Sequence, residues 1–250
     1  MKLWLAAALA LTVTGCAPSR DDREELSRAK SREAGQRAAV AAAAPAPARA
    51  AAPSTSRPRI AVLGDSLTAG LGVAKAAAYP SLLQERLDAA GLDFEIVNAG
   101  VSGDTSAGGL ARLDWALDGD VRILIVALGG NDGLRGLPPA QLQHNLAQII
   151  ERAQAKGITV ILAGMEAPPN YGRDYIVGFH KVYPALAKQY QLEFVPFLLQ
   201  GVAGSEGLNQ RDGIHPTAAG ARIVAANVWS ALKPIAAAQR STPQRGRPGS

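Results

Sequence analysis

Four short polar segments of this 250-residue chain carry the residue types that acyl transfer requires. Their sequences are GDSL (64–67), NAGVSGD (98–104), GGNDG (129–133) and DGIHP (212–216). A serine hydroxyl becomes a good nucleophile when a histidine takes its proton, and a carboxylate then holds the histidine in the required tautomer. The residue types therefore indicate nucleophilic catalysis by Ser66.

His215 is the strongest candidate for the base. Asp212 lies three residues before it, and Gly213 between them lets the chain fold so that the carboxylate reaches the imidazole ring. His144 and His180 lie within helical patterns and have no comparable carboxylate beside them in the sequence, so we expect both to be solvated or structural.

The tetrahedral intermediate of acyl transfer needs hydrogen-bond donors for its oxyanion. Glycines in the second and third polar segments allow the backbone to approach a substrate closely, and Asn131 adds a side-chain amide donor. Losing one such donor typically lowers turnover by about 10²–10³, so these groups should matter nearly as much as the base.

Hydrophobic patterning predicts the elements that position these segments. Short apolar runs typical of buried strands occupy 60–63, 94–98, 121–128, 158–163 and 192–196. Helical patterns occupy 79–90, 105–117, 139–156, 174–190 and 216–232. This alternation predicts a single three-layer α/β/α domain over 59–234, with a mainly parallel five-stranded sheet. Ligands bind beyond the carboxyl ends of such strands, which is where the first three polar segments lie.

The four segments, in this order, resemble the sequence blocks of the SGNH (GDSL) hydrolase family. The resemblance implies a flavodoxin-like sheet and a catalytic set of Ser66, Asp212 and His215. It also implies an oxyanion hole made by the backbone N–H groups of Ser66 and Gly103 and the side chain of Asn131. No metal or organic cofactor is implied.

Residues 130–136, 168–172 and 212–216 resemble the bacterial branch of multifunctional arylesterases, acyl-CoA thioesterases and lysophospholipases. The resemblance implies cleavage of small amphiphilic or aryl acyl esters, with acyl thioesters as a further class. We expect the acyl chain to lie against apolar side chains of two loops, although such residues could instead close the core. These side chains are Leu134, Leu137, Ala167, Pro168, Pro169 and Tyr171.

The same four segments of the chain bear on two other functions and two other kinds of site. A carbohydrate O-acetylesterase would use the same machinery in a more open, polar cleft. A non-enzymatic binding module would be expected to lack a catalytic residue, and none is missing. The nucleophile motif of α/β-hydrolases is Gly-x-Ser-x-Gly, and Thr68 stands in place of its last glycine, which disfavours that fold. The aspartates of the four segments lack a recognisable metal-ligand spacing, and we expect Asp65 and Asp132 to accept backbone hydrogen bonds instead.

The start of the chain predicts a lipid anchor. Lys2 is followed by an apolar run over 3–13 that is too short to span a bilayer but suits a secretory signal. The VTGC sequence at 13–16 resembles a bacterial lipobox, which implies a signal peptide over 1–15 and lipidation of Cys16, the only cysteine. The predicted location is therefore the bacterial cell envelope, membrane-anchored and facing the periplasm.

Residues 16–58 form a predicted Ala/Pro-rich tether, because the segment has almost no large apolar side chains to bury. Its length would span about 35 Å as a coil and about 130 Å as polyproline II. Residues 235–250 are predicted to be a disordered basic tail. The formal net charge of +5 lies in these tails, since acidic residues outnumber basic ones in 59–232. Nucleic-acid binding is therefore not expected, and we expect a monomer.

Overall fold

The structure, a computed structural model, describes residues 57–240, with side chains described to residue 239. The predicted signal peptide, Cys16, most of the predicted tether and residues 241–250 lie outside the described residues.

The domain is built on a five-stranded sheet with the strand order β2-β1-β3-β4-β5. Its strands are β1 (Arg59–Gly64), β2 (Glu95–Gly100), β3 (Val121–Ala127), β4 (Thr159–Ala163) and β5 (Glu193–Val195). All four strand pairs are parallel. The inner strands read as continuous apolar runs because helices cover both of their faces. This order is the flavodoxin-like one, and the expected parallel α/β/α architecture is confirmed.

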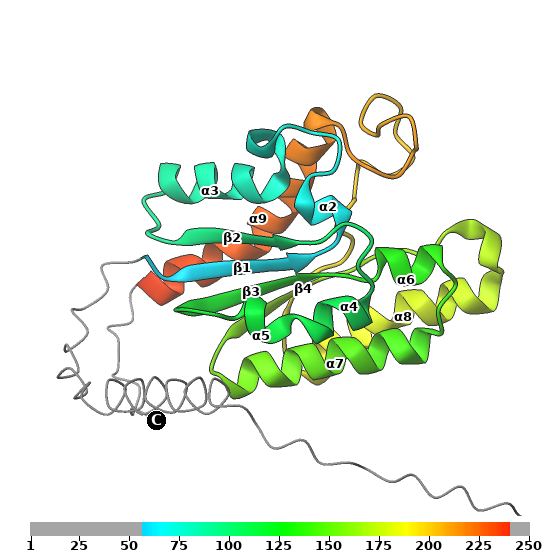
Figure 1. The fold of residues 1–250 in the computed structure, drawn as a ribbon, viewed down its shortest axis with the longest axis horizontal. Helices are drawn as coiled ribbons and strands as arrows, with labels where there is room; N and C mark the ends of the chain where they lie inside the picture. Colours follow the sequence, from blue (N-terminus) through cyan, green and yellow to red (C-terminus); the bar gives the residue numbers. More distant parts are fainter. Residues whose placement is uncertain (1–56, 241–250) are drawn as a thin grey trace, which may run out of the picture. The chain divides into compact units, whose positions relative to one another are not determined.

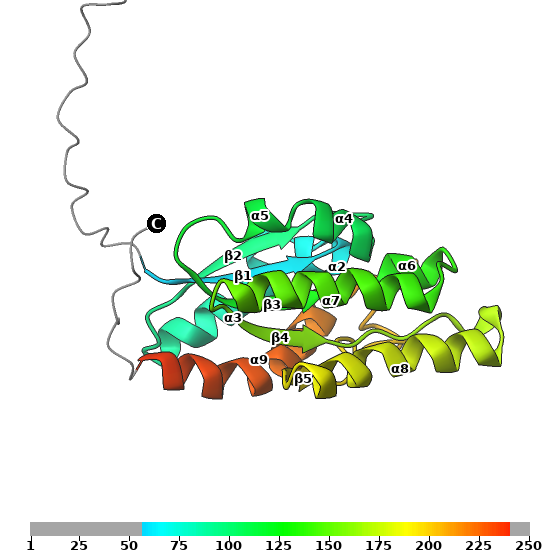
Figure 2. The same cartoon turned by 90° about the horizontal axis from the view of Figure 1, so that it is seen from below.

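Two layers of helices cover the sheet (Figures 1 and 2). The helices α3 (Tyr79–Ala89) and α9 (Ala218–Arg240) pack together on one face. The other face carries α4 (Ser106–Ala111), α5 (Leu113–Ala116), α7 (Pro139–Ala155) and α8 (Arg173–Gln189). The strands in Figure 1 run toward the end of the domain that carries the one-turn helices α2 (Ser66–Ala69) and α6 (Gly130–Leu134).

Some local elements differ from the sequence prediction. The patterns did not predict α2 and α6, because a single turn is too short to show helical periodicity. Two short 3₁₀ helices, η1 (Lys75–Ala77) and η2 (Pro169–Tyr171), were also not predicted. The helix expected over 105–117 is interrupted at Arg112, which ends α4 and precedes α5.

The C-terminal helix is longer than expected. It continues to Arg240 through Pro234, so the boundary predicted at residue 234 lies inside α9. The prediction that the disordered tail starts at 235 is wrong for 235–240. Ala236 is fully buried and Ile235 packs against the core, and this burial offsets the backbone hydrogen bond that a proline removes. No helix within residues 57–240 is long and apolar enough to cross a membrane.

Candidate active site

The candidate nucleophile lies where β1 turns sharply into α2. Ser66 is the first residue of α2, and the preceding Asp65 is its N-cap, whose carboxylate accepts a hydrogen bond from the Leu67 amide at 3.0 Å. Gly70 ends the helix with a φ of 78°, a conformation that glycine adopts without strain. The short helix thus holds the Ser66 hydroxyl at the carboxyl end of the sheet.

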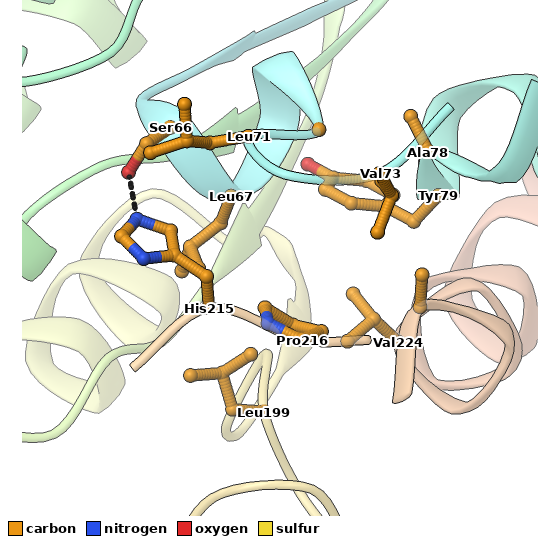
Figure 3. Close-up of a pocket in the computed structure, with 12 residues that line it drawn as sticks. Ser66, Leu67, Leu71, Val73, Ala78, Tyr79, Leu199, His215, Pro216 and Val224 are labelled. Carbon is orange, nitrogen blue, oxygen red and sulfur yellow. Dashed lines mark hydrogen bonds between the residues drawn. The ribbon is translucent and has the colours of Figure 1, made fainter. Parts of the chain in front are cut away.

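The hydroxyl of Ser66 lies in a continuous hydrogen-bonded chain with His215 and Asp212. His215 Nε2 is 2.9 Å from Ser66 Oγ, and His215 Nδ1 is 2.6 Å from Asp212 Oδ2. Figure 3 shows the imidazole ring turned toward the serine. Gly213 has a φ of 71°, which permits the turn that brings Asp212 back to the ring. The structure therefore brings together the three residues expected from the sequence.

Hydrogen bonds hold Asp212 in its charged form. Its Oδ1 accepts the backbone N–H groups of Ile214 at 2.9 Å and of His215 at 3.0 Å. Together with the bond to the His215 ring, these donors lower the pKa of Asp212 to about 2. The carboxylate therefore stays ionised at any pH at which an imidazole could act as a base.

The expected oxyanion donors lie on two further strand ends. Gly103 follows β2 with a φ of 85°, and Asn131 lies in α6 after β3. The Asn131 side-chain nitrogen donates to the Asp104 carbonyl at 2.9 Å and lies 3.3 Å from Asp65 Oδ2. Gly103, Asn131 and Ser66 all line one cleft. The sequence-predicted donors are therefore close together in space.

Two buried aspartates stabilise the loops around the site. Asp65 is only 2% exposed, and burial raises its pKa to about 6. Asp132 is 1% exposed and accepts hydrogen bonds from the backbone N–H of Ser106 at 2.8 Å and from its hydroxyl at 2.5 Å. Both carboxylates accept backbone hydrogen bonds, as expected from the sequence.

A cleft of about 460 Å³ opens beside the serine and histidine. Its walls are largely apolar and come from loops at the carboxyl ends of all the strands. The apolar lining residues are Leu67, Leu71, Leu134, Met165, Ala167, Pro168, Pro169, Phe197, Leu199, Ala203 and Ile214. Polar lining groups include Ser102 and Glu166. The cleft is large enough and apolar enough for an acyl chain.

The structure corrects part of the expected acyl wall. Leu134, Ala167 and Pro168 line the cleft, but Leu137 and Tyr171 are not among its lining residues. The Tyr171 hydroxyl donates to the Leu134 carbonyl at 2.7 Å. Its ring lies so close to Gly136 that a β-carbon there would be 2.6 Å from it. Tyr171 thus braces the loop that carries Leu134 and does not itself line the cleft.

Several cleft residues were not expected from the sequence. Leu71 lies just after α2, Phe197 after β5 and Ile214 directly before His215. The sequence offered one indication that these residues line the cleft: each lies in a loop that follows a strand or helix at the carboxyl edge of the sheet. The structure also gives His180 a carboxylate partner, since its Nδ1 lies 2.7 Å from Glu166 Oε1. The sequence hid this pair because its members are on a loop and on α8.

A second, much smaller void lies behind the serine and histidine (Figure 3). Its volume is about 10 Å³, and Val73, Tyr79, Leu199 and Val224 are among its mostly apolar lining residues. This volume is at the lower limit for one water molecule, so the void is no substrate site. Within residues 57–240, no three His, Cys, Asp or Glu side chains are grouped to hold a metal ion.

Comparison with known proteins agrees with this geometry. Residues 62–223 match the model of the GDSL-like Lipase/Acylhydrolase family. The chain is 50% identical over 175 residues to Esterase TesA of Pseudomonas aeruginosa, covering 70% of this chain and 87% of the relative. It is 39% identical over 175 residues to thioesterase 1/protease 1/lysophospholipase L1 of Escherichia coli, covering 70% and 83%.

A solved structure gives the same result for the fold. The crystal structure of TesA superposes with a TM-score of 0.68 at 49% identity, covering 71% of this chain and 99% of that one. The fold and the sequence of most of the domain are thus similar to those of proteins of known class. The chain belongs to the GDSL-like lipase/acylhydrolase family, the SGNH hydrolases.

Proposed function

We propose that this chain is a serine esterase that cleaves carboxylic esters through an acyl-enzyme on Ser66. The observation that carries the proposal is the hydrogen-bonded chain from Ser66 Oγ to His215 Nε2 at 2.9 Å and from His215 Nδ1 to Asp212 at 2.6 Å. Membership of an acylhydrolase family supports the same chemistry.

The reaction follows from the positions of these three groups. His215 Nε2 takes the proton of Ser66 as Oγ attacks the acyl carbonyl carbon, and the carbonyl oxygen becomes an oxyanion. The histidine then gives the proton to the departing alcohol oxygen, and the C–O bond breaks to leave the acyl-enzyme. Water, deprotonated by His215, attacks the acyl carbon, and Ser66 leaves with the returned proton. The Asp212 carboxylate stabilises the imidazolium in both steps.

The oxyanion is stabilised by hydrogen-bond donors from three different strand ends. We assign this role to the backbone N–H groups of Ser66 and Gly103 and to the side-chain N–H₂ of Asn131. The Asn131 nitrogen is held by the Asp104 carbonyl and lies only weakly hydrogen-bonded, at 3.3 Å, to Asp65. A hydrogen bond of that length is readily exchanged for one to an oxyanion.

The shape and chemistry of the cleft favour an apolar acyl group. Its largely apolar walls support esters of aliphatic or aryl acids and lysophospholipids over an acetylated polysaccharide, which needs polar contacts along the sugar. The Escherichia coli relative is named a thioesterase and lysophospholipase, which supports thioesters as a further class. Product analysis after incubation with lysophospholipid, acyl-CoA and acetylated glycan would show which of the three substrate classes the protein cleaves fastest.

Anchoring in the bacterial envelope is part of the proposal. The support is the lipobox-like sequence at 13–16 and the low-complexity segment that separates it from the domain. The test is incorporation of labelled fatty acid into the full chain and recovery of the protein in the membrane fraction. Cys16→Ser should abolish both. Light scattering on the Cys16→Ser protein should report a monomer.

The central test is removal of the nucleophile. Ser66→Ala should lower kcat for p-nitrophenyl butyrate by at least about 10⁴-fold and abolish labelling by a fluorophosphonate probe. Ser230→Ala, an exposed serine on α9, serves as the matched control and should retain wild-type values. Full activity of Ser66→Ala would contradict the proposed mechanism.

A further inference from the structure

We propose that Arg112 is a positioning residue that holds the three oxyanion donors of the site in register. The inference rests on the proposed function and adds a residue to its machinery. Arg112 is the residue at which the helix breaks between α4 and α5, with φ −106° and ψ 14°. Its side chain is only 18% exposed, which is unusually low for an arginine.

The guanidinium group of Arg112 makes three hydrogen bonds with different parts of the site. Its Nη2 donates to the Gly64 carbonyl at 2.8 Å, at the end of β1. Its Nη1 donates to the Ala99 carbonyl at 2.7 Å, in β2. Its Nε donates to Asp104 Oδ2 at 2.6 Å, in a salt bridge that is mostly shielded from solvent. One planar group thus ties together the two strand ends and the loop after β2.

Two of these contacts lie within two residues of a proposed oxyanion donor. Gly64 is two residues before Ser66, and Asp104 directly follows Gly103. The Asp104 carbonyl accepts the hydrogen bond that orients the Asn131 amide at 2.9 Å. Movement of Arg112 would therefore loosen the attachment of all three donors at once.

The geometry explains why the residue is an arginine. Arginine presents five N–H donors in a rigid planar fork, whereas lysine offers one compact charge on a flexible stem. A lysine could retain the ion pair with Asp104 but could not reach two carbonyls and a carboxylate together. Gly108 leaves room for this arrangement, because a β-carbon there would lie 2.7 Å from Asp104 Oδ1.

The test compares ligands that do and do not form an oxyanion. In an alkyl trifluoromethyl ketone, Ser66 Oγ adds to the carbonyl carbon, its proton passes to His215, and the carbonyl oxygen becomes an alkoxide at the oxyanion position. 1-Octanol has an apolar chain suited to the apolar cleft, and it forms no such adduct. Misplacing a reacting group by about 1 Å can cost about 10² in rate, so a looser site should weaken only the first ligand and turnover.

We expect Arg112→Lys in the full-length protein to lower kcat by about 10- to 100-fold with KM changed less than about threefold. The inhibition constant of the trifluoromethyl ketone should rise by a similar factor, and that of 1-octanol by less than about twofold. Arg122→Lys is the matched control, since Arg122 pairs with Asp120 at the start of β3, the opposite end of the sheet. It should leave kcat and both inhibition constants unchanged.

A folded Arg112→Lys protein with wild-type kcat would overturn the inference, as would equal weakening of both inhibitors. If thermal denaturation shows that this variant does not fold, Asp104→Asn provides the test with the same two inhibition constants. A rise in the inhibition constant of the ketone alone supports the inference, and an equal change in both inhibition constants overturns it. A wild-type protein that cleaves no ester would instead contradict the proposed function.

Discussion

The buried carboxylate of Asp65 lies 3.3 Å from the side-chain nitrogen of Asn131, although the two residues are separated by 66 positions in the chain. The contact joins the segment that carries the proposed nucleophile, Ser66, to the segment that carries a proposed oxyanion donor, Asn131. It also places a carboxylate whose ionisation is opposed by burial beside the reacting groups.

Asp65→Asn should change the pH dependence of stability. Burial raises the pKa of Asp65 from 3.8 to about 6, so the folded protein keeps this proton between about pH 4 and 6 while the unfolded chain loses it. Wild-type stability therefore falls over that window as the pH rises. The variant lacks this titration, so its unfolding free energy relative to wild type should rise by on the order of 1–3 kcal/mol from pH 4 to 7.

Urea denaturation at several pH values measures this difference. Ser230→Ala, an exposed position on α9 that carries no ionisable group, is the control and should show a difference from wild type that does not vary with pH. A difference for Asp65→Asn that stays constant between pH 4 and 7 would contradict the assigned pKa shift.

Asp212→Asn should impair catalysis without unfolding the domain. The amide cannot stabilise the imidazolium and favours the wrong tautomer of His215, so we expect kcat for p-nitrophenyl butyrate to fall by about 10³–10⁴. The pKa of Asp212 is about 2, so its protonation should not shape the rate profile of the wild type above pH 4. Steady-state kinetics at pH 7.5, with thermal denaturation to check folding, would test this. Retention of more than a tenth of the wild-type kcat would count against the assigned role.

Ala167→Phe should shorten the proposed acyl-binding cleft. Ala167 lines the cleft beside Pro168, and the added ring would occupy part of its 460 Å³. We expect kcat/KM for p-nitrophenyl decanoate to fall about tenfold or more. The kcat/KM for p-nitrophenyl acetate should change by less than about threefold. Ala155→Phe, at the exposed end of α7, is the control and should preserve the chain-length profile. An equal loss for both esters would argue that the long acyl chain lies elsewhere.

Gly100→Ala should disturb, through backbone contact, the turn from β1 into α2 that carries Ser66. A β-carbon at Gly100 would lie 2.3 Å from the Ala69 nitrogen and 2.7 Å from the Thr68 carbonyl carbon, both in α2. Backbone atoms cannot move aside as a flexible side chain can, so we expect a loss of about 1–3 kcal/mol in unfolding free energy and lower kcat.

Gly178→Ala provides the comparison for that change. Gly178 lies within α8, and a β-carbon there would meet only Pro139 atoms at 3.6 Å and beyond. Alanine in a helix interior is favoured over glycine by about 0.5–1 kcal/mol, so this variant should be as stable as wild type or more stable. Chemical denaturation of both variants would check the contrast, and an unchanged Gly100→Ala protein would refute the packing argument.

The layered fold was predictable because its signal is local. Runs such as 60–63 and 123–128 are apolar at every position, since both faces of an inner strand are buried, and helical patterns separate them. Ser66, Asn131 and His215 could be identified as candidate site residues for a related reason. Each lies in a short motif whose glycines allow sharp turns at the carboxyl edge of a sheet.

Other features depend on contacts between distant segments, which no local pattern records. Ala236 continues α9 because it is buried against the core, and Tyr171 is turned from the cleft by its bond to the Leu134 carbonyl. Arg112 reads as an ordinary helix residue, and only the folded chain places its guanidinium against β1, β2 and Asp104. The sequence by itself determined which groups could react. The tertiary structure decided which side chains hold those groups in place, because burial and hydrogen-bond partners are set by segments far apart in the chain.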